Sequence, residues 1–253
     1  MLREMDADIY IACKLRPTSF GIALLKKWLS TSPVLLDIDD WEAGFYYHSN
    51  FWGRVGRFLN FSNPNGLPYT WLMEKLVGFA DSIIVSNRFL QDRFTGFMIR
   101  HCRDTTVLNP DNFDPQKVKI SLGLGRNRVI MFMGTPRAHK GIDDLIQAFE
   151  SLISSDLRLV FFGGESSFYS TRSKSSLIQE RVVIFPKVPF EELPKYLSAA
   201  DILVIPQRDT TDTQGQSPAK LFDAMAMAKP IITTRVSDIP EVLGENGYLV
   251  EPG

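Results

Sequence analysis

A glycine and several basic residues follow one apolar run of the sequence in a spacing that suits an anion. The run Val129–Met133 predicts a buried strand that ends at Gly134. A short loop with Thr135, Arg137 and Lys140 follows, and a helix pattern starts at position 141. Glycine lets the backbone approach a phosphate, Arg and Lys neutralise its charge, and a helix N-terminus presents free N–H groups. The alternative interpretation is a solvated basic turn.

A second helix start precedes another buried strand, in the stretch QGQSPAKLFDAMAMAKPIITT at 214–234. Ser217 is the expected N-cap, with Pro218 at the first helical position. The free amides of this helix start would suit a diphosphate, and Asp223 would accept hydrogen bonds from a ribose diol. The alternative is a plain amphipathic helix with an ion pair between Lys220 and Asp223, worth only about 0.2–0.5 kcal/mol.

Strand and helix patterns that could position these residues alternate along almost the whole chain. Short runs rich in Val, Ile and Phe are separated by amphipathic segments, which predicts α/β domains with parallel sheets and right-handed crossovers. The charged stretch 115–126 predicts a linker between a first domain at 1–114 and a second at 127–253. The predicted strands are 9–12, 34–38, 82–85, 105–108, 129–133, 157–162, 182–185, 202–205 and 230–233.

Composition excludes some classes of protein. The 253 residues are 44% apolar and 23% charged with a net charge of −1, so no basic field favours a nucleic-acid partner. Two cysteines far apart in the sequence, Cys13 and Cys102, form no disulfide framework, which favours a reducing cytoplasm. No apolar run is long enough to predict a spanning helix, and the first residues lack the layout of a signal peptide.

Taken in order, the motifs resemble the family-4 (group 1) retaining glycosyltransferases. The matching segments are Gly134 with Lys140 and Gly141, FFGG at 161–164, AADILVIP at 199–206, SPAKLFDAMA at 217–226, KPII at 229–232 and GYLV at 247–250. The resemblance implies a GT-B-like fold, in which two Rossmann-like domains face a cleft. It also implies transfer of a sugar from a UDP- or GDP-linked donor to a glycan, lipid or small-molecule acceptor, with retention and without a metal or other cofactor. Polysaccharide biosynthesis in the cytoplasm is the expected setting.

The resemblance also assigns roles to individual residues. Lys140 matches the lysine that contacts the donor diphosphate, and Asp223 matches the second acid of an E-x7-E motif that holds the ribose. Together with Arg137, these two are the expected catalytic residues. The first acid of that motif is replaced by Gly215. The expected donor-binding residues are Gly134, Thr135 (at the usual arginine position, with Arg137 as its substitute), Gly163, Ser217, Pro218, Ala219, Lys220 and Leu221.

Against the family pattern, the sequence lacks an opening glycine-rich loop and the final helices. We therefore expect an incomplete acceptor-side domain at 1–114 and a donor-side domain at 127–253 without its last helices. The alternative function is an inactive remnant or fragment that binds a nucleotide and transfers nothing, and a third is a sugar-nucleotide epimerase.

Two further groups of residues have more than one interpretation. Asp37, Asp39 and Asp40 lie at the end of a predicted strand and could hold a metal, but we favour Asp39 and Asp40 as acceptor-side residues, with no metal site. The segment FYYHSNFWGRVGRFLNF at 45–61 interleaves aromatic residues with Arg54 and Arg57. It would serve as a peripheral contact with the inner face of the membrane, as a lid, or as an aromatic platform for the acceptor.

Overall fold

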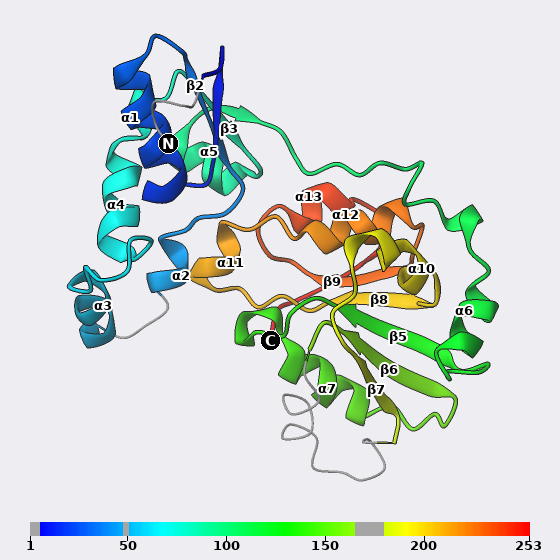
Figure 1. Ribbon diagram of the computed structural model, residues 1–253. Helices are drawn as coiled ribbons and strands as arrows, with labels where there is room; N and C mark the ends of the chain where they lie inside the picture. The colour runs from blue at the N-terminus through cyan, green and yellow to red at the C-terminus, as the bar shows by residue number, and fades with distance from the viewer. Residues whose placement is uncertain (1–5, 48–50, 165–179) are drawn as a thin grey trace. The chain divides into compact units, whose positions relative to one another are not determined.

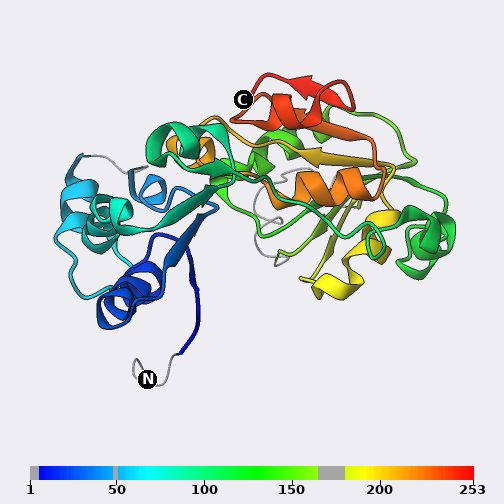
Figure 2. The same cartoon turned by 90° about the horizontal axis from the view of Figure 1, so that it is seen from above.

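The computed structural model describes residues 6–47, 51–164 and 180–253, which form two compact units (Figures 1 and 2). Unit 1 contains the described residues through His101 together with Thr210–Ser217. Unit 2 contains Cys102–Asp209 and Pro218–Gly253. Each unit has its own parallel sheet, so the predicted α/β class is confirmed.

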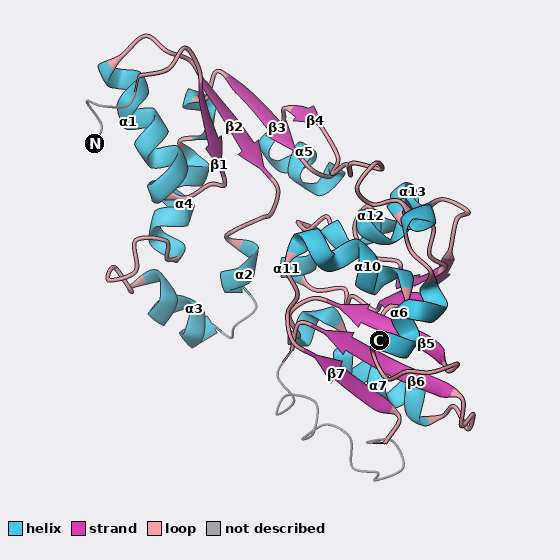
Figure 3. Ribbon diagram, turned by 45° about the vertical axis from the view of Figure 1, so that its right-hand side comes forward, coloured by secondary structure: helices cyan, strands magenta, loops and turns pink. Residues whose placement is uncertain are grey.

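The sheet of unit 1 has four parallel strands whose spatial order follows the chain (Figure 3). They are β1 (Tyr10–Cys13), β2 (Val34–Ile38), β3 (Ser82–Val85) and β4 (Phe97–Met98). Side chains alternate along each strand, so Tyr10 and Ala12 are buried in the core of the unit while Ile11 and Cys13 are exposed. The helical segments are η1 (Pro17–Gly21), α1 (Ile22–Leu29), α2 (Gly44–Tyr47), α3 (Phe51–Phe58), α4 (Leu67–Lys75), η2 (Val77–Phe79) and α5 (Arg88–Phe94).

A late segment of the chain completes unit 1. Helix α11 (Thr211–Gln214) lies beside α2, as Figure 1 shows. The backbone N–H of Trp41 donates to the carbonyl of Gly215 at 3.1 Å. A Cβ atom at Gly215 would lie 2.4 Å from the Cβ of Trp41, so any side chain there would collide with the tryptophan. Glycine at the position of the family's first acid therefore has a packing cause within unit 1.

The sheet of unit 2 has six parallel strands and is doubly wound. Its order is β10-β9-β8-β5-β6-β7, so the winding direction reverses between β5 and β8. Apolar clusters fill both faces, one against α7 and the other against α6, α10, α12 and α13. The strands are β5 (Arg128–Met133), β6 (Leu157–Phe162), β7 (Val182–Phe185), β8 (Ile202–Ile205), β9 (Ile231–Thr234) and β10 (Tyr248–Val250). The helices and single turns are η3 (Pro110–Asn112), α6 (Pro115–Ser121), η4 (Ala138–Lys140), α7 (Ile142–Glu150), η5 (Phe190–Glu192), α10 (Leu193–Ser198), α12 (Ala219–Ala226) and α13 (Ile239–Leu243).

Two predicted segments differ from the structure. Residues 105–108, predicted as a strand, form a turn that Asp104 caps through its contacts with Thr106. Residues 115–126, predicted as a linker, contain α6, whose buried Val118 joins Leu124 in the core of unit 2. The chain therefore passes from unit 1 to unit 2 after His101 rather than after Asp114. The sequence did not predict α6 because most of its exposed residues are polar and its apolar stripe is short.

Candidate functional site

Two glycines in contact shape the carboxyl ends of β5 and β6. Gly134 has a φ of +125° and Gly163 a φ of +101°, conformations that favour glycine. The N–H of Gly134 donates to the carbonyl of Phe162 at 2.8 Å. A Cβ at Gly163 would lie 3.1 Å from the carbonyl carbon of Gly134, so a side chain there would crowd the strand end. The bare backbone leaves room for a ligand beside the two strands.

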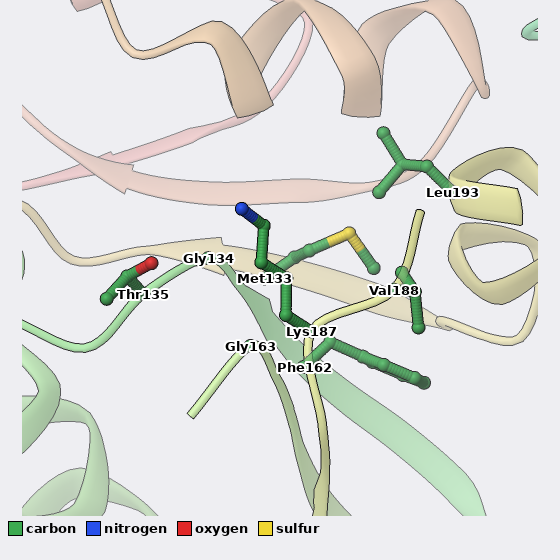
Figure 4. Close-up of a pocket in the computed structure, with 8 residues that line it drawn as sticks. All are labelled: Met133, Gly134, Thr135, Phe162, Gly163, Lys187, Val188 and Leu193. Atoms are coloured by element: carbon green, nitrogen blue, oxygen red, sulfur yellow. The ribbon is translucent and has the colours of Figure 1, made fainter. Parts of the chain in front are cut away.

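A pocket of about 170 Å³ opens at these glycines (Figure 4). Its walls are mostly apolar, and the Lys187 side chain extends along it toward Gly134 in Figure 4. Ligands of open α/β sheets bind outside the carboxyl ends of the strands, where the winding reverses. The pocket lies at that edge of unit 2, and its lining residues are Met133, Gly134, Thr135, Phe162, Gly163, Lys187, Val188 and Leu193.

The loop that carries Lys140 is held by the segment that follows β8. Gly141 has a φ of +63°, and a Cβ there would lie 1.7 Å from the carbonyl oxygen of Pro206, so this backbone approach requires glycine. The N–H of Arg208 donates to the carbonyl of His139 at 2.9 Å. The Arg208 guanidinium also forms two hydrogen bonds with Asp144 in α7, at 2.7 and 2.5 Å. Arg208 was not predictable from the sequence, since nothing local links it to this loop.

Two lysines converge on Gly134. A Cβ built at Gly134 would lie 3.7 Å from the Nζ of Lys220 and 3.9 Å from the Nζ of Lys140. Lys140 donates to the carbonyl of Thr135 at 2.9 Å, and the Lys220 ammonium lies 4.2 Å from the ring centroid of Phe132. Burial lowers the pKa of Lys220 well below its usual value, and the charge of Lys140 lowers it further. A bound polyanion would stabilise both charges, since Lys220 has no ion-pair partner within the described part of the chain.

The start of α12 differs in detail from the prediction. The helix begins at Ala219, its N-cap is Pro218, and no side chain caps it, so the prediction of Ser217 as N-cap is wrong. Ser217 closes the segment that belongs to unit 1. The N–H of Leu221 already donates to the carbonyl of Pro218 at 2.9 Å, and the Leu221 side chain is buried in the core. The side chain of Lys220 is the group that this first turn directs to Gly134.

Asp223 is paired with an arginine distant in sequence. The Nε of Arg103 donates to its Oδ1, and Arg103 also donates to the carbonyls of Ala219 at 3.1 Å and Cys102 at 2.8 Å. The Asp223 side chain is 11% exposed. The ion pair between Lys220 and Asp223 that one interpretation of the sequence required is therefore wrong. Arg103 instead ties the first two turns of α12 to the segment at which unit 2 begins, a contact that no pattern in the sequence indicated.

The remaining predicted residues lie at two other places. Arg137 precedes η4 in the Lys140 loop and is exposed. In unit 1, the Nζ of Lys14 contacts Asp39 at 3.2 Å, Asp40 at 3.0 Å and Glu42 at 3.5 Å. Burial and the Asp39 charge raise the pKa of Asp40. Burial by itself lowers the pKa of Lys14, but the charges of Asp40, Asp39 and Glu42 outweigh this effect, so the pKa of Lys14 is raised. The two aspartates thus belong to an ion-pair cluster at the end of β2.

Enzymes that bind nucleotides on a doubly wound sheet do so at the carboxyl ends of its strands, where unit 2 places the pocket, the two glycines and the converging Lys140 and Lys220. Residues 127–253, half of the chain, match the family described as Glycosyl transferases group 1, and the chain belongs to this family. A putative teichuronic acid biosynthesis glycosyltransferase of Bacillus subtilis, TuaC, is 28% identical over 191 residues, which are 70% of this chain and 44% of TuaC. A GDP-mannose-dependent phosphatidylinositol monomannoside mannosyltransferase of Mycolicibacterium smegmatis is 28% identical over 189 residues, 68% of this chain and 49% of the relative. The chain spans about half the length of these curated relatives.

Solved structures share the fold. Sucrose-phosphate synthase from Thermosynechococcus elongatus has a TM-score of 0.74 at 16% identity, covering 99% of this chain and 62% of the synthase. HepE from Anabaena, in complex with UDP-glucose, has a TM-score of 0.70 at 16% identity, covering 97% of this chain and 65% of HepE. These neighbours are GT-B glycosyltransferases, so the predicted GT-B fold is confirmed.

Proposed function

We propose that the protein transfers a sugar from a UDP- or GDP-linked donor to an acceptor, and that unit 2 binds the donor. The convergence of Lys140 and Lys220 on Gly134 carries this proposal, because two ammonium groups beside a bare strand end suit a diphosphate. Family membership supports the reaction class. HepE has been solved with UDP and with UDP-glucose, and one relative is named as GDP-mannose-dependent, which motivates testing both bases.

The proposed chemistry is electrostatic. The bond between the anomeric carbon and the diphosphate oxygen breaks, its electron pair passes to the diphosphate, and negative charge grows there. The oxygen of an acceptor hydroxyl forms the new bond to the anomeric carbon, and the hydroxyl proton passes to the departing diphosphate. Lys140 and Lys220 are placed to stabilise this charge, and Arg137, in the same exposed loop, would add a third cation. Because three cations serve this purpose, the proposed reaction needs no metal, and we propose that it retains the anomeric configuration, as the family resemblance implies.

Asp223 and the pocket would orient the nucleoside. The Oδ1 of Asp223 is engaged by Arg103, so we propose that its second oxygen accepts from the ribose, with Arg103 as the positioning residue. The apolar pocket beside Gly163 would receive the base. Asp39 and Asp40 remain proposed acceptor-side residues, and the acceptor class proposed is a glycan or a lipid-linked glycan.

Calorimetric titration of UDP, GDP and ADP into the protein, with and without Mg²⁺, tests the donor site. We expect one uridine or guanosine diphosphate to bind equally well in both conditions. Lys140→Ala should weaken this binding about tenfold or more, the loss of roughly one charge-assisted hydrogen bond. Lys117→Ala, an 85% exposed lysine of the same unit, is the matched control and should leave binding unchanged.

The outcomes separate the two candidate functions. Binding that Lys140→Ala leaves unaltered would refute the role of this lysine, and a failure of all three nucleotides to bind would refute the donor site. Binding of one nucleotide, without hydrolysis of the corresponding nucleotide-sugar or transfer of its sugar by the full-length protein, would favour the inactive nucleotide-binding remnant.

A further inference from the structure

One side of unit 1 carries an unusual number of exposed aromatic side chains. Figure 1 shows α1, α4 and α3 one after another along this side, and Figure 3 shows the same succession. Trp52 is 77% exposed, Trp28 is 61% exposed and Trp71 is 42% exposed, whereas the fourth tryptophan, Trp41, is 7% exposed. We define the aromatic surface by Trp28, Trp52, Phe58, Trp71, Leu72 and Phe79.

Ring contacts join the helices that form the aromatic surface. Phe58 of α3 meets Trp71 of α4 edge to face, with centroids 6.2 Å apart. Trp28 of α1 meets Phe79 of η2 in the same way at 6.4 Å. The two ring pairs thus join α1 to η2 and α3 to α4, and only Leu76 separates α4 from η2 in the chain. Exposed apolar areas of this extent mark interaction sites.

Helix α3 supplies an apolar face that unit 1 does not cover. On a helical period, Phe51, Trp52, Val55 and Phe58 lie on one side, with Arg57 on the other. The three aromatic members of this face are all exposed. An amphipathic helix with an exposed apolar side and basic residues on its polar side is typical of helices that lie in a membrane interface. This observation disfavours the lid interpretation, in which the face would pack on the unit.

The charges near the aromatic surface are mostly positive. Helices α1, α3 and α4 carry Lys26, Lys27, Arg57 and Lys75, and of these Lys27 pairs with Asp81 at 2.7 Å. Lys75 lies 5.5 Å from the ring centroid of Trp71 and is itself exposed. The one acid of α4, Glu74, is directed inward, where it accepts from the indole of Trp41 at 2.8 Å and pairs with Arg93. Since the whole chain has a net charge of −1, this basic character is local.

We propose that the aromatic surface docks unit 1 on a bilayer that contains anionic lipid. Tryptophan rings favour the boundary between headgroups and acyl chains, and Lys and Arg beside them attract anionic headgroups. Among the described residues no helix is both long and apolar enough to cross a membrane. The surface extends the 45–61 segment to α1, α4 and η2, and the docking does not depend on which sugar, if any, the protein transfers.

Vesicle co-sedimentation of the intact protein tests the docking. Vesicles of phosphatidylcholine mixed with phosphatidylglycerol should bind the protein more strongly than vesicles of phosphatidylcholine alone, and added salt should weaken the binding. Trp52→Ser combined with Trp71→Ser, and Lys26→Glu combined with Lys75→Glu, should each weaken binding about tenfold or more. All four positions are at least partly exposed, so far-UV circular dichroism should be unchanged.

The matched control removes exposed apolar residues from the other unit. Ile153→Ser combined with Phe190→Ser changes side chains that are 97% and 55% exposed in unit 2, and should bind vesicles as the wild type does. Absence of binding to the mixed vesicles would overturn the proposal, as would equal loss in the control. A dimer that the tryptophan variant dissociates, without vesicle binding, would also overturn it and assign the surface to a second copy. Nucleotide titration of the same variants keeps this result separate from the donor site.

Discussion

Replacement of Lys220 by methionine should make the protein more stable while it abolishes donor binding. The stem of Lys220 places its ammonium 4.2 Å from the ring centroid of Phe132, and methionine would keep most of that packing. Burying an ammonium group without an ion pair destabilises the folded chain by several kcal/mol. The contact with the aromatic ring offsets about 0.5–2 kcal/mol of that cost. We therefore expect the free energy of unfolding to rise by roughly 1–3 kcal/mol in Lys220→Met.

The pH dependence of this effect has a defined sign. Burial lowers the pKa of Lys220 in the folded chain below the 10.5 of an ordinary lysine. Between those two pKa values the unfolded chain binds more protons, so the stability of the wild type rises with pH across that interval. Lys220→Met removes this dependence on pH. The difference in free energy of unfolding between the variant and the wild type should therefore shrink as the pH rises toward the pKa of an ordinary lysine.

Urea unfolding followed by circular dichroism, at neutral and alkaline pH, measures both effects. Lys140→Met is the control, because the Lys140 ammonium is hydrogen-bonded to Thr135 and lies in an exposed loop. It should change stability by less than about 0.5 kcal/mol. A Lys220→Met protein that is less stable than the wild type, or that retains the full pH slope, would refute the reasoning about the buried charge.

Three other substitutions test the contacts that hold the site and unit 1. Gly141→Ala should lower the free energy of unfolding by about 3 kcal/mol or more in urea melts, against about 1 kcal/mol for Gly123→Ala, where φ is +71° but space is open. Arg103→Ala leaves the buried carboxylate of Asp223 unpaired and should cost about 2–4 kcal/mol in the same assay; a loss below about 0.5 kcal/mol would contradict the pairing. Gly215→Ala should disturb the packing of Trp41, visible as a changed near-UV circular dichroism spectrum, and an unchanged spectrum would argue against the close approach.

The sequence was sufficient to predict the fold class and the loop around Lys140, because both depend on local patterns. Runs of Val, Ile and Phe define the strands of a sheet that is covered on both faces, and Gly134 stands where one of them ends. The glycine and the lysine were recognisable since each residue type has a specific use beside an anion. The pattern also predicted a helix start near 218, although the cap itself was wrong.

What escaped prediction was mostly long-range. Arg103 reaches Asp223 across 120 positions, and Pro206 lies over Gly141 only because the winding direction of the sheet reverses between β5 and β8. Neither contact leaves a periodic trace in the sequence. The convergence of Lys220 with Lys140 is also a long-range contact. It requires the ends of β5 and β8, the strands that precede the two lysines in the chain, to be adjacent in space. The sequence presented Lys220 as the partner of Asp223 because only neighbours within the helix were visible.

The insertion of residues 210–217 into unit 1 constrains the order in which the two units can finish folding. Trp41 leaves the ribosome 174 positions before Gly215, the residue whose carbonyl accepts from its backbone N–H. Domains commonly fold as they emerge, the N-terminal one first. Here the nascent first unit lacks the Gly215 carbonyl, to which the backbone N–H of Trp41 donates, until β5, β6, β7 and β8 of the second unit have been translated. Long sequence separation between contacting residues slows folding. Unit 1 is therefore completed by a late segment of the chain, residues 210–217, after most of unit 2 has been made.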